Sequence, residues 1–558
     1  MSLPNFFDTL YPLAFPENIK IWDRLAAQAG LDEFLLMENA GRAALQVLHS
    51  LINHLHGKKA LILMGNGNNG GDAACVARNL NDYHVECKIF SFKTRNEFSP
   101  PCKKHLELAL FNGSKFYTLP NDIALESPAL FLQEILTLFN GFPDIIVDGL
   151  LGTGFQGPLK ENMLRLIEAI NFLNINIPSI IVLSLDIPSG MDARTGKVVP
   201  TAIKATATAN FASIKVGEIF SSSKQWTGKL YNCNIGIPQK IICETEPKFW
   251  LLDGHILKCL PNPATNTFKN FYGHVVVIGG RKGLTGAATL AAHGALCTGA
   301  GLVTVMAPTA CCATIKNGLP EIMTVGLGEL NNEIWPENIG DNEIAILNKS
   351  DAIVIGPGFG READSEKFFN IFLNLAPKKP LILDADALIL ISKNHEFKDW
   401  ITTPVILTPH PGEAAQLLNC SGADIQEDRL TAMEHLCGLL PGGSIILKGA
   451  NTLIGQMNMP CFICPYDIPQ LAIAGAGDVL SGCLGALAAN KLFENYSFLQ
   501  KAALGVILHA LAGKIMEKLY PMRGLTASRL AETIPHVWNY YDKFPDSERE
   551  TVILPWPE

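Results

Sequence analysis

Two glycine-rich stretches contain the residues best suited to hold phosphate. The first, GNGNNGGD at 65–72, follows an apolar run at 59–64 and precedes the helix-like AACVARNL. The second, AGAGD at 474–478, opens the helix-like VLSGCLGALAAN. Glycines let the backbone approach a ligand closely, and the first N–H groups of a helix have no partner inside it. Both stretches therefore predict anion-binding turns, although an ordinary turn with Asp72 as helix N-cap is an alternative for the first.

Acidic residues close two apolar runs of the first half. DIIVDGL reaches Asp148 and is followed by GTGFQGP at 152–158, and SIIVLSLD ends at Asp186, shortly before Ser189. Together with Asn69, these side chains offer oxygen ligands for a hard monovalent cation and a carboxyl group for proton transfer. Each aspartate could instead simply cap the loop that follows its strand.

Asp478 closes the second glycine-rich stretch, where it suits a different reaction. Phosphoryl transfer to a hydroxyl requires N–H donors that stabilise the moving charge and a carboxylate that accepts the hydroxyl proton. The N–H groups of Gly475, Ala476 and Gly477 are predicted to be those donors, and Asp478 to be the base. A glycine-rich helix start with a first-turn acid is the structural alternative.

Short apolar runs rich in Ile and Val must position these residues. They end in Gly, Asp or Pro, which is typical of strands covered on both faces in a parallel sheet flanked by helices. Ligands of such sheets bind beyond the carboxyl ends of the strands. The runs lie at 59–64, 144–150, 179–186, 274–280, 301–307, 351–358, 380–386, 404–410 and 444–450.

The length and the pattern predict two domains. At roughly 100–200 residues per domain, 558 residues are too many for one ordinary core. The segment between about 240 and 265 contains prolines and has weak periodicity, and the strand–loop–helix pattern restarts after it. We therefore divide the chain into 1–245 and 246–558. No sequence repeat links the halves, which indicates a fusion of different α/β domains.

Charge and cysteine content narrow the class of protein. A net charge of −9 without a basic block disfavours nucleic-acid and anionic-membrane partners. Neither a signal peptide nor a membrane-spanning run is predicted. Fourteen cysteines without a framework pattern indicate reduced thiols in the cytoplasm. Cys461 and Cys464 have metal-like spacing but no second pair, so buried strand cysteines are expected.

The first half resembles the NAD(P)H-hydrate epimerase family over roughly residues 15–240. The resemblance lies in GNGNNGGD, VDGLLGTG, LDIPSGMD and the preceding MENAGR. It implies a Rossmann-like fold that interconverts the R and S epimers of hydrated NADH and NADPH. It also implies potassium at Asn69, Asp148 and Ser189, with Asp186 at the ligand. The hydrate-binding residues that it implies are Asn68, Asn69, Gly70, Gly71, Asp72, Gly152, Thr153, Gly154, Phe155, Gln156, Gly157, Pro158 and Asp186.

Three departures from the epimerase pattern stand out. Ala73 occupies a position where a further glycine is usual, and Gly149 replaces a more common alanine. Asn210-Phe211-Ala212 replaces a Thr-Phe-Gly pattern. None of these departures removes a residue that the resemblance places at the ligand.

The second half resembles the ADP-dependent NAD(P)H-hydrate dehydratase family over about 250–540. The motifs occur in family order and are GHVVVIGG, GAGLV, GPGFG, DADAL, TPHPGE, KGANT and GAGD. They imply a ribokinase-like fold in which the S-hydrate is phosphorylated from ADP with Mg²⁺, and phosphate is then eliminated.

Residue roles in the second half follow from this resemblance and from chemistry. Asp478 is the predicted catalytic base, and Glu413 could orient a magnesium-bound water or cap the next helix. Asp384 and Asp386 are expected to be structural or to support residues that contact the ligand. Departures from the pattern are Phe268, Ile389 and Arg529. The implied hydrate-binding residues are Ala287, Gly358, His410 and Asp478, and the implied ADP- or AMP-binding residues are Lys448, Gly449, Ala450, Asn451, Thr452 and Gly477.

The leading interpretation is a bifunctional isomerase and lyase that repairs NADHX and NADPHX. The first half would supply the S-hydrate, and the second would return NAD(P)H with release of AMP and phosphate. The alternatives are a ribokinase-like small-molecule kinase and a first half that only binds dinucleotide. The choice between ADP and ATP stays open, and a homo-oligomer is expected.

Overall fold

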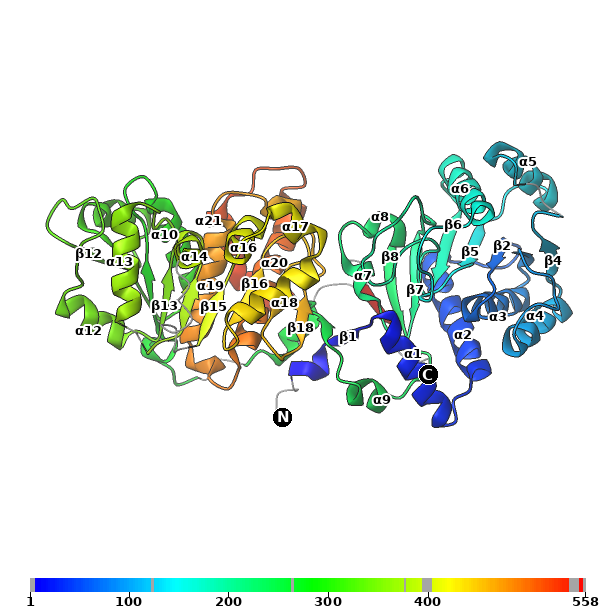
Figure 1. Ribbon diagram of the computed structural model, residues 1–558, viewed down its shortest axis with the longest axis horizontal. Coiled ribbons are helices and arrows are strands. Elements are labelled where there is room, and N and C mark those ends of the chain that lie inside the picture. Colours follow the sequence, from blue (N-terminus) through cyan, green and yellow to red (C-terminus); the bar gives the residue numbers. More distant parts are fainter. Residues whose placement is uncertain are drawn as a thin grey trace. The chain divides into compact units, whose positions relative to one another are not determined.

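The computed structural model describes residues 6–121, 125–261, 265–375, 378–393, 404–540 and 551–554, which form two compact units (Figure 1). The N-terminal unit contains the described residues of 12–249 and 551–554, and the C-terminal unit those of 6–11 and 250–540. The short strands β1 (Tyr11–Leu13) and β9 (Phe249–Leu251) run across the division. The chain passes from the N-terminal to the C-terminal unit after Phe249, four residues after the expected 245. Residues 6–11 belong to the C-terminal unit and residues 551–554 to the N-terminal unit, which is the reverse of the expected division.

The sheet of the N-terminal unit has the strand order β19-β8-β7-β6-β5-β2-β3-β4, and its strands pair in parallel. The order reverses between β2 and β5, which is where the chain leaves the sheet in opposite directions and where such folds bind ligands. This is the order of a Rossmann-like sheet. The strands are β2 (Lys59–Met64), β3 (Glu86–Ser91), β4 (Lys115–Thr118), β5 (Ile145–Gly149), β6 (Ile181–Leu185), β7 (Ala207–Phe211), β8 (Lys229–Cys233) and β19 (Thr551–Leu554).

Helices cover both faces of this sheet because successive strand residues point to opposite sides. Ala60 and Ile62 belong to a core with α1 (Pro16–Gln28), α2 (Glu33–Leu51), α3 (Asn68–Asp82) and α4 (Pro100–Phe111). Leu61 and Leu63 belong to a second core with α5 (Pro128–Phe139) and α6 (Glu161–Asn176). Three short helices complete the unit, namely α7 (Val216–Ile219), α8 (Lys224–Thr227) and α9 (Gln239–Glu244).

The sheet of the C-terminal unit includes the run β18-β17-β16-β15-β14-β13-β10-β11-β12. Its strands pair in parallel from β16 to β12, and β17 and β18 extend the sheet antiparallel. The order reverses between β10 and β13. The strands are β10 (His274–Ile278), β11 (Leu302–Pro308), β12 (Met323–Leu327), β13 (Ala352–Ile355), β14 (Leu381–Leu383), β15 (Val405–Leu407), β16 (Ser444–Leu447), β17 (Leu453–Gly455) and β18 (Cys461–Ile463).

One face of this sheet packs on α10, α19, α20 and α21. Helix α20 is long and apolar enough to cross a membrane by length and composition, but 72% of its apolar window is buried, so it is a core helix. The fold class, an α/β chain with a Rossmann-like and a ribokinase-like unit, is as expected. The helices are α10 (Thr285–Cys297), α11 (Cys312–Gly318), α12 (Asp341–Lys349), α13 (Ala363–Asn374), α14 (Asp386–Ser392), α16 (Pro411–Leu418), α17 (Gly422–Glu427), α18 (Arg429–Leu439), α19 (Ala476–Ala489), α20 (Phe498–Leu519) and α21 (Ala527–Tyr540).

Candidate functional site

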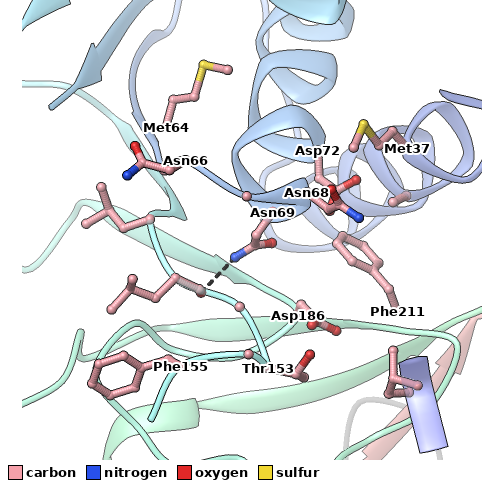
Figure 2. A pocket seen from close by; sticks show the side chains of 18 of the residues that line it. Met37, Met64, Asn66, Asn68, Asn69, Asp72, Thr153, Phe155, Asp186 and Phe211 are labelled. Carbon is pink, nitrogen blue, oxygen red and sulfur yellow. Dashed lines mark hydrogen bonds between the residues drawn. The ribbon is translucent and has the colours of Figure 1, made fainter. Parts of the chain in front are cut away.

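A pocket of about 830 Å³ lies at the point where the strand order of the N-terminal unit reverses (Figure 2). Its lining comes mainly from the loops after β2, β5, β6 and β7, and from the helices α1, α2, α3 and α6. Its volume is that of a site for a cofactor-sized molecule. Figure 2 shows Asn68, Asn69 and Asp72 on α3, with Thr153 and Asp186 across the pocket from them.

Glycines bring the two loops of this pocket together. A Cβ atom on Gly65 would lie 1.8 Å from the Leu150 carbonyl oxygen, and one on Gly70 would lie 2.1 Å from the Gly65 carbonyl oxygen. A side chain at Gly65 would therefore push the two loops apart, and one at Gly70 would distort the first loop itself. The N-cap of α3 is Gly67, and Asp72 lies one turn inside the helix and is buried. The alternative explanation of Asp72 as helix N-cap is therefore wrong.

Asn69 joins the loops after β5 and β6 through its side-chain amide. Its Nδ2 donates to the carbonyl oxygens of Leu151 at 2.9 Å and Leu185 at 3.0 Å. Its Oδ1 is buried and has no hydrogen-bond partner among the described residues. A buried acceptor without a partner is costly, so a ligand that offers positive charge would be held there.

Asp148 is a fully buried carboxylate that accepts hydrogen bonds from neutral donors only. Ser189 donates from its hydroxyl at 2.6 Å and from its backbone N–H at 2.9 Å. The Ser184 hydroxyl and the Leu150 N–H donate at 2.9 and 3.3 Å. Burial raises the pKa of Asp148, and these bonds oppose the shift. The Ser189 hydroxyl also accepts from Leu151 N–H at 2.9 Å, which ties Asp148 to the loop that Asn69 holds.

Asp186 follows β6 and forms an ion pair with the fully buried Lys215. Its backbone is left-handed, with φ of 64°, so the chain turns sharply there and the carboxyl group lines the pocket. The Lys215 backbone N–H donates to Glu218 at 2.9 Å. Asp23 on α1 and Asp72 on α3 also line the pocket. Four carboxyl groups thus surround one ammonium group. We call these five residues the carboxylate cluster, namely Asp23, Asp72, Asp186, Lys215 and Glu218.

Carboxyl groups in this cluster hold protons more tightly than usual. Burial raises the pKa of Asp72 well above its ordinary value, and the charges of Asp186 and Asp23 add to this effect. Burial and Asp186 raise the pKa of Asp23 to about 6. Burial raises the pKa of Glu218 to about 8, although Lys215 opposes it. One buried ammonium group cannot balance four carboxylates, so the cluster carries at least one proton near neutral pH.

Not every residue expected at this ligand lines the pocket. Gly70 and Gly71 serve close packing, since a Cβ on Gly71 would lie 2.7 Å from the sulfur of Met37. Gln156, Gly157 and Pro158 lie outside the lining. The expected residues that do line it are Asn68, Asn69, Asp72, Gly152, Thr153, Gly154, Phe155 and Asp186.

Three members of the carboxylate cluster, namely Asp23, Lys215 and Glu218, have no role predicted from the sequence. They come from α1 and from the segment after β7, which carry no glycine loop. The one available signal was Lys215, a lysine shortly after a strand in an apolar context.

The second candidate site lies at the carboxyl ends of β14, β15 and β16. Lys448, which follows β16, donates to Asp384 at 2.8 Å and lies 3.7 Å from a carboxyl oxygen of Glu413. The Thr408 hydroxyl donates to the same Asp384 oxygen at 2.6 Å. Burial alone would lower the pKa of Lys448, but Asp384 and Glu413 outweigh it and the pKa is raised. Lys448 therefore stays charged.

Asp478 lies in the first turn of α19, next to Lys448. Gly475, whose φ is 89°, is the N-cap of this helix, and a Cβ on Gly477 would lie 3.5 Å from Lys448 Nζ. His509 on α20 donates to the Ala476 carbonyl oxygen at 2.9 Å and fixes this start. Burial raises the pKa of Asp478 to about 7, with a further contribution from Asp384. The turn thus combines helix N–H groups, a lysine and a carboxylate that gains or loses its proton near neutral pH.

Glu413 and His410 form the cap of α16. The His410 backbone N–H donates to Glu413 Oε2 at 2.7 Å, while Gly412 N–H donates to His410 Nδ1 at 2.9 Å. Glu413 thus has the capping role that is one of its two expected roles, and the His410 side chain caps the same helix. Burial nevertheless raises the pKa of Glu413 to about 7, and His410 keeps 55% of its side chain exposed.

The remaining expected residues lie on neighbouring loops. A Cβ on Gly358, whose φ is 61°, would lie 3.2 Å from the Ala287 side chain, so these two residues are adjacent. Asp386 accepts from Gly360 N–H at 2.9 Å, in line with its expected structural role. The Asn451 side chain is buried and donates to the Pro465 carbonyl oxygen at 3.3 Å, and its own carbonyl oxygen accepts from Arg429 at 3.5 Å.

Known proteins resemble each unit and the whole chain. Residues 33–217 match the family described as YjeF-related protein N-terminus, and residues 275–536 match the family described as NAD(P)H-hydrate dehydratase. The bifunctional NAD(P)H-hydrate repair enzyme Nnr of Moorella thermoacetica is 33% identical over 95% of this chain and 96% of its own length. The enzyme of the same name from Escherichia coli is 31% identical over 94% and 93%.

Solved structures resemble about half of this chain. A ribokinase-like superfamily protein of Enterococcus faecalis is 25% identical and covers 53% of this chain and 96% of its own, with a TM-score of 0.45. The ADP/ATP-dependent NAD(P)H-hydrate dehydratase of Bacillus subtilis is 24% identical and covers 52% and 98%, with a TM-score of 0.43.

Proposed function

This chain belongs to the family of bifunctional NAD(P)H-hydrate repair enzymes, and from that premise we propose which of its residues carry each reaction. It repairs hydrated NADH and NADPH as an isomerase and a lyase. We assign epimerisation to the pocket of the N-terminal unit and dehydration to the site around Asp478. The observation that carries the assignment is that each unit has its own glycine-rich turn with a carboxyl group beside it.

Epimerisation requires a proton to move twice. The bond between the ring carbon and the hydroxyl breaks as a carboxyl group gives the leaving oxygen a proton, so that water departs and an iminium forms. Water then adds to either face and returns a proton to the carboxylate. We assign the transfer to Asp186, because its carboxyl group lines the pocket and interacts with Asp23 and Asp72. Burial and like charges raise the pKa of both neighbours, so they can return a proton to Asp186.

Potassium fits the chemistry of the adjacent loop. Asn69 Oδ1 is a buried oxygen without a partner, and Asp148 is a buried carboxylate whose hydrogen-bond donors are all neutral. A potassium ion held by Asn69, Asp148 and Ser189 would supply positive charge beneath the hydrate-binding loops. We expect K⁺ to raise the midpoint of thermal unfolding of the enzyme and Asn69→Ala to remove this effect, with Li⁺ as the control ion.

Dehydration starts from the hydroxyl of the S-hydrate. We propose that Asp478 accepts the hydroxyl proton as the hydrate oxygen attacks the terminal phosphoryl group of ADP, which leaves AMP. The N–H groups at the start of α19 and the Lys448 ammonium stabilise the phosphoryl charge. The ring nitrogen then expels phosphate, and loss of a ring proton restores the reduced nicotinamide. Mg²⁺ would arrive with the nucleotide and offset its phosphate charge. We assign nucleotide binding to Lys448–Thr452 and Gly477, and hydrate binding to Ala287, Gly358 and His410.

Two variants that each lose one reaction test the assignment. Asp478→Asn should abolish dehydration and keep epimerisation, whereas Asp186→Asn should return only the S fraction of a mixed hydrate. The recovered absorbance of reduced nicotinamide, with ADP and Mg²⁺ present, reports both outcomes. An equimolar mixture of the two variants should restore complete recovery, because each supplies the step that the other lacks.

The outcomes also separate the alternatives. If Asp478→Asn lost both reactions, the division of labour between the units would be wrong. A small-molecule kinase would accumulate a phosphorylated product without releasing phosphate, so phosphate and AMP are measured alongside absorbance. A merely dinucleotide-binding first unit would return the R fraction at the spontaneous rate in the unmodified enzyme. Parallel assays with ATP decide the nucleotide.

A further inference from the structure

We propose that Glu38, Cys75 and His105 form a binding site for one divalent transition-metal ion, with Zn²⁺ as the ion that the donors favour. The three residues come from α2, α3 and α4. One ligand atom from each lies within 4.8 Å of the other two. Sulfur, imidazole nitrogen and carboxylate oxygen are the three ligand types that zinc accepts. Mg²⁺ and Ca²⁺ prefer oxygen ligands alone and would be disfavoured here.

His105 has the hydrogen bonding of a metal-binding histidine. The side chain is completely buried and stacks on Phe34 with 4.3 Å between the ring centres. Nε2 lies 3.4 Å from the Phe34 carbonyl oxygen, which can only accept, so Nε2 carries the hydrogen. Nδ1 then holds a lone pair, and this buried nitrogen has no hydrogen-bond partner among the described residues. Metal-binding histidines commonly donate their other ring N–H to a backbone carbonyl in this way.

Glu38 keeps one carboxyl oxygen for the site. Arg42 and Arg78 both donate to Oε1, at 2.9 and 2.6 Å. Oε2 is therefore left on the side of Cys75, whose sulfur lies 3.6 Å away. The arginines hold the carboxylate in a fixed orientation, as second-layer partners of metal ligands do. Their charges oppose a cation, and the thiolate formed on metal binding offsets one of them.

Cys75 supplies a buried thiol whose sulfur packs closely against the backbone of Gly41. A Cβ on Gly41 would lie only 2.4 Å from this sulfur, so the glycine leaves room for it. Asn79 Nδ2 lies 3.6 Å from the sulfur and can donate to a thiolate. Zinc binding would break the S–H bond, form a Zn–S bond and release one proton to solvent without any change in oxidation state.

The proposed metal site lies directly behind residues that line the pocket of the N-terminal unit. Glu38 follows Met37, and Cys75 lies one turn after Asp72, and both Met37 and Asp72 line the pocket. A metal ion would join α2, α3 and α4 directly behind these residues. Metal binding is therefore expected to raise the thermal midpoint of the N-terminal unit.

The full-length enzyme, freed of metal with a chelator, tests the proposal. Zn²⁺ affinity and stoichiometry are measured by competition with a chromophoric chelator, and Co²⁺ serves as a spectroscopic probe for a thiolate ligand. We expect one Zn²⁺ per chain, about one proton released, and a near-ultraviolet thiolate-to-cobalt band. Cys75→Ser should remove the band, and Cys75→Ser and His105→Asn should each weaken Zn²⁺ binding at least about 10-fold.

Cys87→Ser is the matched control, because Cys87 is a buried cysteine of the same unit outside the cluster. It should keep the unmodified affinity and the cobalt band. Binding of less than one Zn²⁺ per chain, a cobalt spectrum without the thiolate band, or equal affinities in all variants would overturn the proposal. Proton release and the cobalt band are read on the unmodified enzyme, so they decide the matter even where a variant folds poorly.

Discussion

At the scale of single residues, two departures from the epimerase pattern, Ala73 and Gly149, lie in contact with each other. A Cβ on Gly149 would lie 2.6 Å from the Cβ of Ala73, so the glycine at 149 makes room for the alanine at 73. The two positions therefore act as one exchanged pair across the contact between β5 and α3. The sequence shows both departures but not that they face each other, because this contact exists only in the folded sheet.

A double-mutant cycle tests this pairing. Gly149→Ala alone should lower the stability of the N-terminal unit by about 1–3 kcal/mol, because the added methyl group overpacks the contact. Adding Ala73→Gly should restore only part of the loss, since it removes the clash with the Ala73 Cβ but leaves the Asn69 carbonyl oxygen 2.7 Å from the added methyl group. The midpoints of thermal unfolding of the four proteins provide the measurement. Strictly additive effects would show that the two residues are not coupled.

A second prediction at this scale concerns the pH dependence of dehydration. Burial and Asp384 raise the pKa of Asp478 to about 7, so the group is protonated and inactive as a base below that pH. We therefore expect kcat/KM for the S-hydrate to rise roughly tenfold per pH unit below about pH 7 and to level off above it. Rates with the pure S epimer across this range measure the profile. A profile that stays flat would remove Asp478 from the role of base.

Sequence reasoning predicts the site residues that lie next to glycine loops and strand ends, because loop chemistry is local. Of these, Asn69 and Asp186 line the pocket, and Asp478 lies in the first turn of α19. Lys215 and Asp23 are not predicted in this way, because their place in the carboxylate cluster depends on how α1 and the segment after β7 pack. Charge balance in a buried cluster is a tertiary property.

At the scale of elements, the start of α19 is held by its close packing on α10. A Cβ on Gly482 would lie 1.8 Å from the Ala291 carbonyl oxygen, and one on Gly294 would lie 2.4 Å from the Val479 carbonyl oxygen. The two helices thus touch backbone to backbone. Since α10 carries Ala287 and α19 carries Asp478, their separation sets the distance between the proposed hydrate site and the base.

Gly482→Ala should therefore separate the helices. We expect it to destabilise the C-terminal unit by about 1–3 kcal/mol or more and to slow dehydration, while epimerisation is unchanged. Gly438→Ala in α18 is the matched control, because a Cβ there meets nothing within 4 Å. Calorimetry and the two assays read the outcome, and equal behaviour of both variants would exclude the packing argument.

All nine strands expected from apolar runs are present in the structure, with shifts of a few residues at their ends. Several further strands were missed. β7, with the sequence ATANF, is fully buried although it has no Ile or Val, because small residues fill the space between the helix layers. β3 contains the buried Lys88, whose ammonium donates to the Leu138 carbonyl oxygen at 2.8 Å. Burial in these strands follows from their neighbours and leaves no local pattern.

At the scale of the whole molecule, the division between units does not follow the order of the chain. β19 pairs in parallel with β8 in the N-terminal unit, although the chain reaches it only after the C-terminal unit. The predicted single cut at 245 cannot reproduce this arrangement, because apolar periodicity carries no information about which distant strand a segment pairs with.

Fragments test the contribution of this strand. A fragment of residues 12–249 leaves β8 as an unpaired edge, which favours aggregation. Joining residues 545–558 to it through a flexible linker should raise its thermal midpoint by roughly 2–8 °C, equivalent to about 1–2 kcal/mol for a unit of this size. The same linker with a scrambled 545–558 sequence is the control. Equal midpoints for the native and scrambled versions would show that β19 contributes no stability.

Because β19 pairs with β8, the sheet of the N-terminal unit can be completed only late in translation. β19 is translated roughly 300 residues after β8, which at about 5–20 residues per second takes some 15–60 s. During that interval the nascent N-terminal unit has an open sheet edge while the C-terminal unit is still being made. The unit whose residues emerge first is thus completed late, and its exposed edge is where we expect a chaperone to act during translation.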